Sequence, residues 1–208
     1  IEGLQSHRGL YSASGDADTA EIILHERIQV PGEHQRKNLL AAALACRAFG
    51  IDASVVASSI STFPGVEHRL ERFAEKNGIT WYNDSAATIP QAVSAAIYSF
   101  ETPVILITGG TDKNTDFSVA QNAYLKAKHV VLLAGSGTDK LIPILEADRI
   151  PFAGPYDNIT HAVSEAGARA VRGDIVILSP GCASFGMFIH EFDRGLKFKD
   201  AVRSYLGL

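Results

Sequence analysis

Small and polar residues follow four apolar segments of the chain, and they are the residues best suited to bind a ligand. These stretches are 83–88, 108–114, 135–138 and 179–184. They offer hydroxyl groups, the amide groups of glycine-containing turns, and one lysine, Lys113, close to a diglycine. Exposed N–H groups and a single ammonium group suit a carboxylate or a phosphate. The sequence therefore predicts a site for a small anionic ligand.

Each stretch also has an interpretation that needs no ligand. Asp84 and Ser85 would serve equally well as caps of a helix that begins near Pro90. A diglycine permits a chain reversal whatever the function, and a loop lysine is commonly solvated. Gly135-Ser136-Gly137 lacks the third glycine of a dinucleotide fingerprint, so we interpret it as a plain turn. The phosphate-binding motif GxxxxGK[ST] does not occur in the 208 residues.

Two interpretations stay open for the basic pair His68-Arg69. Charges of opposite sign alternate around it at Glu67, Arg69, Glu71 and Arg72, which favours a surface ion-pair cluster. The pair also follows Phe63-Pro64-Gly65, a break in the helical pattern that we interpret as a hinge between two units. Cations beside a hinge are what phosphate binding between domains requires. The residues alone do not separate these interpretations.

The elements that position these stretches follow from the spacing of apolar residues. Short β-branched runs predict strands at 79–82, 103–107, 129–133 and 174–178. Helical periodicity predicts helices at 33–49, 52–62, 90–100 and 117–124. Strands that are apolar throughout are covered on both faces, and their alternation with helices indicates parallel βαβ units. The predicted fold class is α/β, with a Rossmann-like, mainly parallel sheet flanked by helices and ligands at the carboxyl ends of its strands. Residues 1–30 are interpreted as strands and turns.

Composition narrows the class of protein. The net charge of -4 and the pI of about 6.0 argue against a nucleic-acid partner, which would require a basic surface. Cys46 and Cys182 have no CxxC partner, so we expect free thiols and no zinc site. No apolar run reaches the length of a membrane span and no leader is present, which predicts a cytoplasmic protein without a membrane partner. Because the chain begins at Ile1 and not at Met, we expect a fragment.

The motifs occur together in a known order. The segments 65–71, 82–85, 109–113, 178–184 and 194–195 match the C-terminal domain of the Mur ligase family in order and spacing. Residues 31–38, ahead of an alanine-rich helix, resemble the end of that family's central ATPase domain. The resemblance covers roughly residues 30–205. It implies that 1–63 are the end of the central ATPase domain and that 64–208 are the C-terminal, Rossmann-like acceptor-binding domain.

The resemblance implies an ATP-dependent amide ligase of peptidoglycan synthesis. ATP would phosphorylate the alanine carboxylate of UDP-N-acetylmuramoyl-L-alanine, and the amine of D-glutamate would attack the acyl phosphate. The implied cofactors are ATP and Mg, with the Mg ligands mostly outside this chain. No catalytic residue and no metal ligand are assigned, because catalysis would depend on positioning and charge neutralisation. The isolated chain is expected to be inactive.

The family's binding residues carry over by motif position. The resemblance implies that Asn38 contacts adenine, that His68 and Arg69 meet ATP, and that Asp84 meets its ribose. Around D-glutamate it implies Thr88, Lys113, Ser184 and Phe185.

The chain departs from the family pattern at several positions. Ala86 replaces a lysine, and Glu191 stands where an aromatic residue is usual; Gln35, Ile89 and Gly186 are further differences. Without the lysine, the acceptor site has one cation fewer. Two alternatives therefore remain: a ligase of the same superfamily with a different acceptor, and a non-catalytic Rossmann-like module that binds a small ligand or a partner protein. A GxxxxGK[ST] motif upstream of Ile1 would favour a ligase.

Overall fold

The computed structural model describes residues 28–208, which divide into two compact units between Pro64 and Gly65. The strands and turns expected within residues 1–27 lie outside the described residues.

The first unit contains two helices, α3 (Glu33–Ala48) and α4 (Ala53–Ser61). Asp52 caps α4, because its carboxylate accepts a hydrogen bond from the Ser54 amide at 2.8 Å. Apolar side chains from both helices and the preceding segment form one buried cluster, with Val30, Leu39, Leu40, Ala43, Val56 and Ile60. Both predicted helices are confirmed to within one residue at each end.

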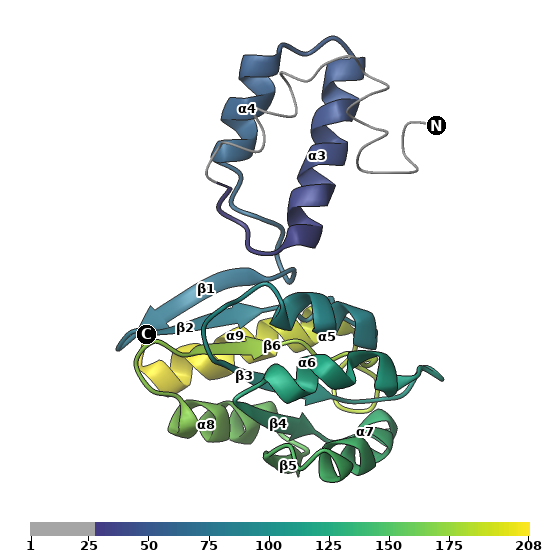
Figure 1. Cartoon of the computed structure of the whole chain (residues 1–208). Coiled ribbons are helices and arrows are strands. Elements are labelled where there is room, and N and C mark those ends of the chain that lie inside the picture. The colour runs from purple at the N-terminus through teal and green to yellow at the C-terminus, as the bar shows by residue number, and fades with distance from the viewer. Residues whose placement is uncertain (1–27) are drawn as a thin grey trace. The chain divides into compact units, whose positions relative to one another are not determined.

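The second unit is built on a six-stranded sheet with the order β1-β2-β6-β3-β4-β5 (Figure 1). The strands are β1 (Glu71–Lys76), β2 (Ile79–Asn83), β3 (Val104–Gly109), β4 (His129–Leu133), β5 (Phe152–Tyr156) and β6 (Ile175–Leu178). Strand β1 pairs with β2 in antiparallel fashion, and the other neighbouring strands are parallel. The predicted α/β fold with a mainly parallel sheet is confirmed.

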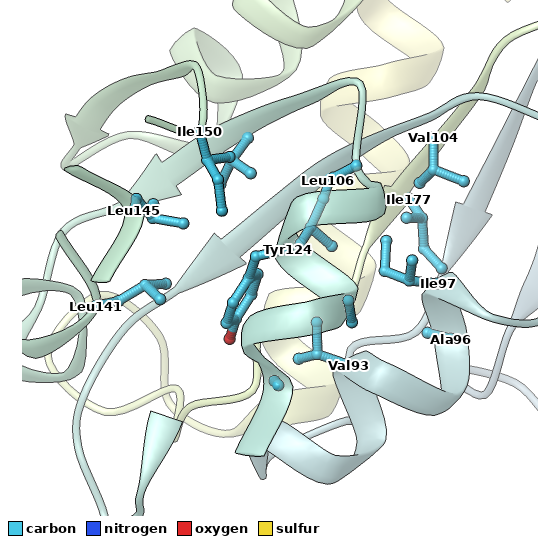
Figure 2. Close-up of a cluster of buried hydrophobic side chains, with 14 of the residues drawn as sticks. Val93, Ala96, Ile97, Val104, Leu106, Tyr124, Leu141, Leu145, Ile150 and Ile177 are labelled. Atoms are coloured by element: carbon cyan, nitrogen blue, oxygen red, sulfur yellow. The ribbon is translucent and has the colours of Figure 1, made fainter. Parts of the chain in front are cut away.

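Both faces of the central strands are buried, which explains why these strands are mostly apolar. Val104 and Leu106 of β3 join one core, whereas Ile105 and Ile107 join the other. The first core, shown in Figure 2, is covered by α5 (Pro90–Ile97), the short 3-10 helix η2 (Phe117–Ala120), α6 (Gln121–Lys126) and α7 (Ser136–Ala147). The second is covered by α8 (Ile159–Arg169) and α9 (Glu191–Leu206).

The structure differs from the sequence-based expectations in detail. The helix predicted for 90–100 ends at Ile97, and the one predicted for 117–124 is a 3-10 turn followed by α6. No element was predicted from the sequence at β1, α7, β5, α8 or α9. Strand β1 has four charged residues among six, and α7 contains Pro143, so neither shows an ordinary pattern.

The backbones of the loops after β3 and β4 are in direct contact. Gly135 precedes α7 and has φ 150, and a Cβ atom there would lie 2.4 Å from the carbonyl carbon and oxygen of Gly110. The Gly137 amide donates to the same carbonyl at 2.8 Å. Glycine at position 135 therefore allows the two loops to meet.

We predict that Gly135→Ala destabilises the second unit more than Gly173→Ala does. Both glycines have positive φ, 150 and 97, so each substitution strains the backbone by roughly 1–3 kcal/mol. Only at Gly135 does the new Cβ also meet backbone atoms, and such overpacking costs about 1–3 kcal/mol more. Urea unfolding, followed by the fluorescence of the single, buried Trp81, measures both losses. Equal losses would show that the close approach carries no energetic weight.

Candidate functional site

The four ligand-binding stretches predicted from the sequence meet at one edge of the sheet. Strands β2, β6, β3 and β4 are mutually parallel, so their carboxyl ends point the same way. The loop after β2 joins the loop after β6, since the Gly181 amide donates to the Ala87 carbonyl at 2.9 Å. Thr111, after β3, exchanges backbone hydrogen bonds of 3.1 and 2.9 Å with Ala183. We call this continuous set of loops the carboxyl rim.

A buried arginine from α9 ties the carboxyl rim together. The Arg194 side chain donates to the Ser85 hydroxyl at 3.0 Å, to the Ser85 carbonyl at 2.8 Å and to the Cys182 carbonyl at 3.1 Å. Its residue is 1% exposed, and burial lowers the pKa of the guanidinium to about 10. Arg194 thus remains charged at neutral pH and fixes two loops at once. In the sequence, Arg194 was recognisable only as part of the motif 194–195, because its partners are 109 and 12 residues away.

A small crevice lies in the carboxyl rim beside Arg194. Ser184 is buried in its wall, and Phe185 next to it is exposed. The wall also includes main-chain atoms of the diglycine turn and apolar side chains, and the full lining is Gly109, Gly110, Leu133, Ala134, Ala183, Ser184, Phe185, Met187, Phe188 and Arg194.

Lys113 and Thr88 lie on the carboxyl rim but outside the lining of that crevice. Lys113 is exposed, and the carboxylate of the adjacent Asp112 pairs with Lys140 instead. Within residues 28–208 Lys113 makes no ion pair or hydrogen bond through its side chain, so its charge is available to a ligand. Thr88 is half-buried in the loop after β2. The structure therefore brings the loops of the predicted acceptor residues together.

Asp84 is buried at the end of β2 with both carboxylate oxygens bonded. One oxygen accepts from the Leu70 amide at 3.1 Å and the other from the Ser179 hydroxyl at 2.8 Å. Burial raises the pKa of Asp84 to about 7, and the hydrogen bonds together with the nearby Arg69 charge oppose that rise. The alternative that Asp84 caps the next helix is wrong, because α5 has Ile89 as its N-cap and no side-chain cap bond.

His68 and Leu70 hold a strained turn on either side of Arg69. Their φ angles are 63 and 46, a region that non-glycine residues rarely adopt. Two carboxylates hold the amides of these residues: Glu71 accepts from His68 at 3.0 Å, and Asp84 accepts from Leu70. Arg69 itself is exposed. The turn therefore presents one cation to solvent from a fixed backbone.

The His68 side chain is buried under this turn. Its Nδ1 lies 2.8 Å from the Asn83 amide nitrogen, and its ring centroid is 5.3 Å from that of Phe192. A Cβ atom at Gly195 would come within 2.2 Å of the same Nδ1. The structure thus places His68 behind Arg69, packed against the start of α9.

The charges around the turn pair differently from the local cluster that the sequence suggested. Lys199, on α9, donates to Glu67 at 2.7 Å and to Glu71 at 2.8 Å, while Arg72 pairs with Glu75. Burial lowers the pKa of Lys199, but the hydrogen bonds to Glu67 and Glu71 and the charges of these two carboxylates together outweigh it, so the pKa is raised. Glu67, His68 and Glu71 form the one group of candidate metal ligands among residues 28–208, and the Lys199 ammonium is already bonded to both glutamates.

The remaining predicted residue, Asn38, is exposed on α3 in the first unit.

Of the positions that depart from the family pattern, Glu191 contacts the carboxyl rim through its backbone, since its carbonyl accepts from the Ser85 hydroxyl at 2.6 Å. Cys182 is buried there too, and burial raises the pKa of its thiol to about 12.

Within residues 28–208, each helix is too short or too polar to cross a membrane.

The chain matches a described protein family and curated relatives. The family is described as Mur ligase, glutamate ligase domain, and its model matches residues 68–182. The UDP-N-acetylmuramoylalanine–D-glutamate ligase of Roseiflexus sp. (strain RS-1) is 42% identical over 88% of this chain and 40% of its own length. The ligase of the same name from Treponema pallidum (strain Nichols) is 45% identical over 71% of this chain and 28% of its own length. The chain thus spans less than half the length of these relatives.

Solved structures share the fold. The UDP-N-acetylmuramate-alanine ligase of Thermotoga maritima superposes with a TM-score of 0.64 at 18% identity, over 86% of this chain and 40% of that one. Escherichia coli FolC, solved with DHPP and ADP, gives a TM-score of 0.60 at 18% identity, over 85% of this chain and 41% of that one. At this level of identity the likeness concerns the fold alone.

We predict that Asp84→Asn changes how stability depends on pH. The folded-state pKa of Asp84 is raised to about 7, so the wild-type unit binds a proton that the unfolded chain has released. Stability should therefore fall as pH rises from about 4 to about 7, by about 2–3 kcal/mol between pH 5 and pH 8. Asparagine keeps an acceptor for the Leu70 amide but does not titrate. The difference in unfolding free energy between variant and wild type, measured by urea and Trp81 fluorescence, should shift toward the variant by that amount. A difference independent of pH would contradict the raised pKa.

Proposed function

This chain belongs to the Mur ligase family, and we propose that it is the C-terminal part of an ATP-dependent ligase that joins D-glutamate to UDP-N-acetylmuramoyl-L-alanine in peptidoglycan synthesis. The observation that carries the proposal is the 42% identity to a relative of that name over 88% of the chain. The cytoplasmic location predicted from the sequence remains part of the proposal, with no nucleic acid or membrane as partner.

We propose that residues 1–63 end the central ATPase domain and that 64–208 form the acceptor-binding domain. The division of the described chain between Pro64 and Gly65 supports this boundary. Asn38, exposed on α3, would contact adenine from the first part.

The nucleotide side of the site would use Asp84 of the carboxyl rim, together with Arg69 and His68 of the turn whose Leu70 amide bonds to Asp84. Arg69 is exposed and offers a guanidinium to a phosphate. His68 is buried, so its part is to support Arg69, and Asp84 would meet the ribose beside it. When bound, ATP supplies the phosphoryl group that activates the alanine carboxylate. We assign no Mg ligand here, because Lys199 is bonded to both glutamates of the one described candidate group.

The acceptor side would use Lys113, Ser184, Thr88 and Phe185. Lys113 provides an available positive charge, and Ser184 provides a hydroxyl in the wall of the crevice beside Arg194. A charged and a neutral donor suit the two carboxylates of D-glutamate. Because Ala86 supplies no cation, Lys113 should carry most of the recognition. Ala86 and Glu191 are also the residues that favour the alternative of a ligase with a different acceptor. A panel of acceptor amino acids, with ADP release as the readout, tests that alternative.

We predict that Lys113→Ala, in the full-length ligase, lowers kcat/KM for D-glutamate by about ten- to a hundredfold. The substitution removes a charge-assisted hydrogen bond, which is worth roughly 1.5–3 kcal/mol. The KM for ATP should change little, since Lys113 is not assigned to the nucleotide. Lys126→Ala is the control, because it removes an exposed lysine at the end of α6, whose ammonium donates to the Phe100 carbonyl and contacts nothing on the carboxyl rim. An unchanged acceptor constant with a weaker ATP constant would overturn our division of the site.

We also predict that the 208-residue chain alone neither hydrolyses ATP nor forms an amide. Its sequence contains no GxxxxGK[ST] motif to hold the phosphates. Release of inorganic phosphate from ATP, measured before and after a further purification step, tests this. A rate that survives the added step would show that the chain has a nucleotide site of its own.

A further inference from the structure

We propose that Lys199 and Glu71 are positioning residues that hold Arg69 in place for the nucleotide without touching it themselves. This inference rests on the proposed function. Its basis is the segment Glu67–Glu71, the Arg69 turn, which is bound to the end of β2 and to α9.

The Arg69 turn needs outside support, because its backbone is strained. His68 and Leu70 both adopt positive φ, and left-handed geometry is unfavourable for residues with a Cβ atom. Such a conformation persists only where surrounding groups determine it. The two amides concerned are held by Glu71 and Asp84, one on each side of Arg69.

Glu71 is the centre of this support. Its Oε2 accepts from the His68 amide at 3.0 Å and from the Asn83 side chain at 3.0 Å. Its Oε1 accepts from Lys199 at 2.8 Å. Both oxygens of the Glu71 carboxylate are therefore bonded to protein donors, and these bonds hold the turn in place.

Lys199 closes the Arg69 turn from α9. Its side chain is 9% exposed, and its ammonium bonds to Glu67 at the first residue of the turn and to Glu71 at the last. Gly195, four residues earlier on the same helix, leaves the space that the His68 ring fills. Residues four apart lie on the same face of a helix, so Gly195 and Lys199 both face the turn. Gly195 packs against His68 in the middle of the turn, and Lys199 binds the glutamates at its two ends.

These contacts fix the backbone on both sides of Arg69 but leave the Arg69 side chain itself unbound. The Arg69 side chain is exposed and makes no hydrogen bond within the described chain, yet the residues before and after it are fixed. If Lys199 is lost, Glu67 and Glu71 become unpaired like charges, and the strained turn should relax. Arg69 would then point in many directions, and nucleotide binding should weaken while acceptor binding should not.

The test is a double-mutant cycle in the full-length ligase, with Lys199→Met, Arg69→Ala and the double variant. Lys199→Met should lower kcat/KM for ATP about tenfold and change the KM for D-glutamate less than about twofold. In the Arg69→Ala background, Lys199→Met should have almost no further effect. Lys199→Arg, which keeps a cation between the glutamates, should restore most of the loss.

Two further measurements separate positioning from folding. Arg203→Met removes an exposed cation from the same helix, one whose guanidinium pairs with the exposed Asp200, and should leave both constants unchanged. Trp81 fluorescence in urea reports whether each variant is folded. If Lys199→Met does not fold, Glu71→Gln replaces it in the cycle, because the amide keeps an acceptor for the His68 amide while the charge that pairs with Lys199 is lost.

The outcomes are distinct. Multiplicative effects of Lys199→Met and Arg69→Ala on the ATP constant overturn the inference, as does an equal loss for ATP and D-glutamate. A wild-type enzyme that shows no D-glutamate ligation overturns the proposed function, and this inference with it. Non-additive effects confined to ATP support both.

Discussion

Arg194 carries a positive charge into the interior with no carboxylate bonded to it among residues 28–208. A buried charge is costly unless every nearby group is placed to satisfy it, and here the groups are backbone carbonyls and a serine hydroxyl from two different loops. The loops after β2 and β6 must therefore keep one relative position. The backbone contacts that join the β3 and β4 loops to them extend this constraint around the carboxyl rim. Because the buried guanidinium needs all of these hydrogen bonds, the loops of the candidate site have few other positions available to them.

Much of the fold was predictable because both faces of its central strands are buried. Runs such as 104–107 and 130–133 are apolar throughout, which is the pattern of a strand between two helical layers. The elements that the sequence analysis missed lack this signal. Strand β1 is an edge strand whose charged side chains hide its alternation, and α7 contains a proline that argues locally against a helix.

The candidate site was predictable as a place but not as a set of contacts. Parallel strands bring their carboxyl ends to one edge, so the loops could be assigned from the sequence alone. One of the two interpretations left open for the charges around His68 paired them with neighbours in sequence, whereas Glu71 is bound by a lysine 128 residues further on. Asp84 was likewise weighed as a local cap but bonds to Ser179, 95 residues away. Spacing along the chain contains no information on such partners.

The burial of Cys182 also decides how the protein meets thiol reagents. With a pKa near 12 that thiol is almost never a thiolate at neutral pH, and the thiolate is the form that alkylating reagents attack. Cys46, on α3, is partly exposed. An electrophile should therefore modify Cys46 and spare Cys182 for as long as the loops around Arg194 stay closed. The slow alkylation of Cys182 would then record, as a chemical rate, how often the edge of the sheet opens to solvent.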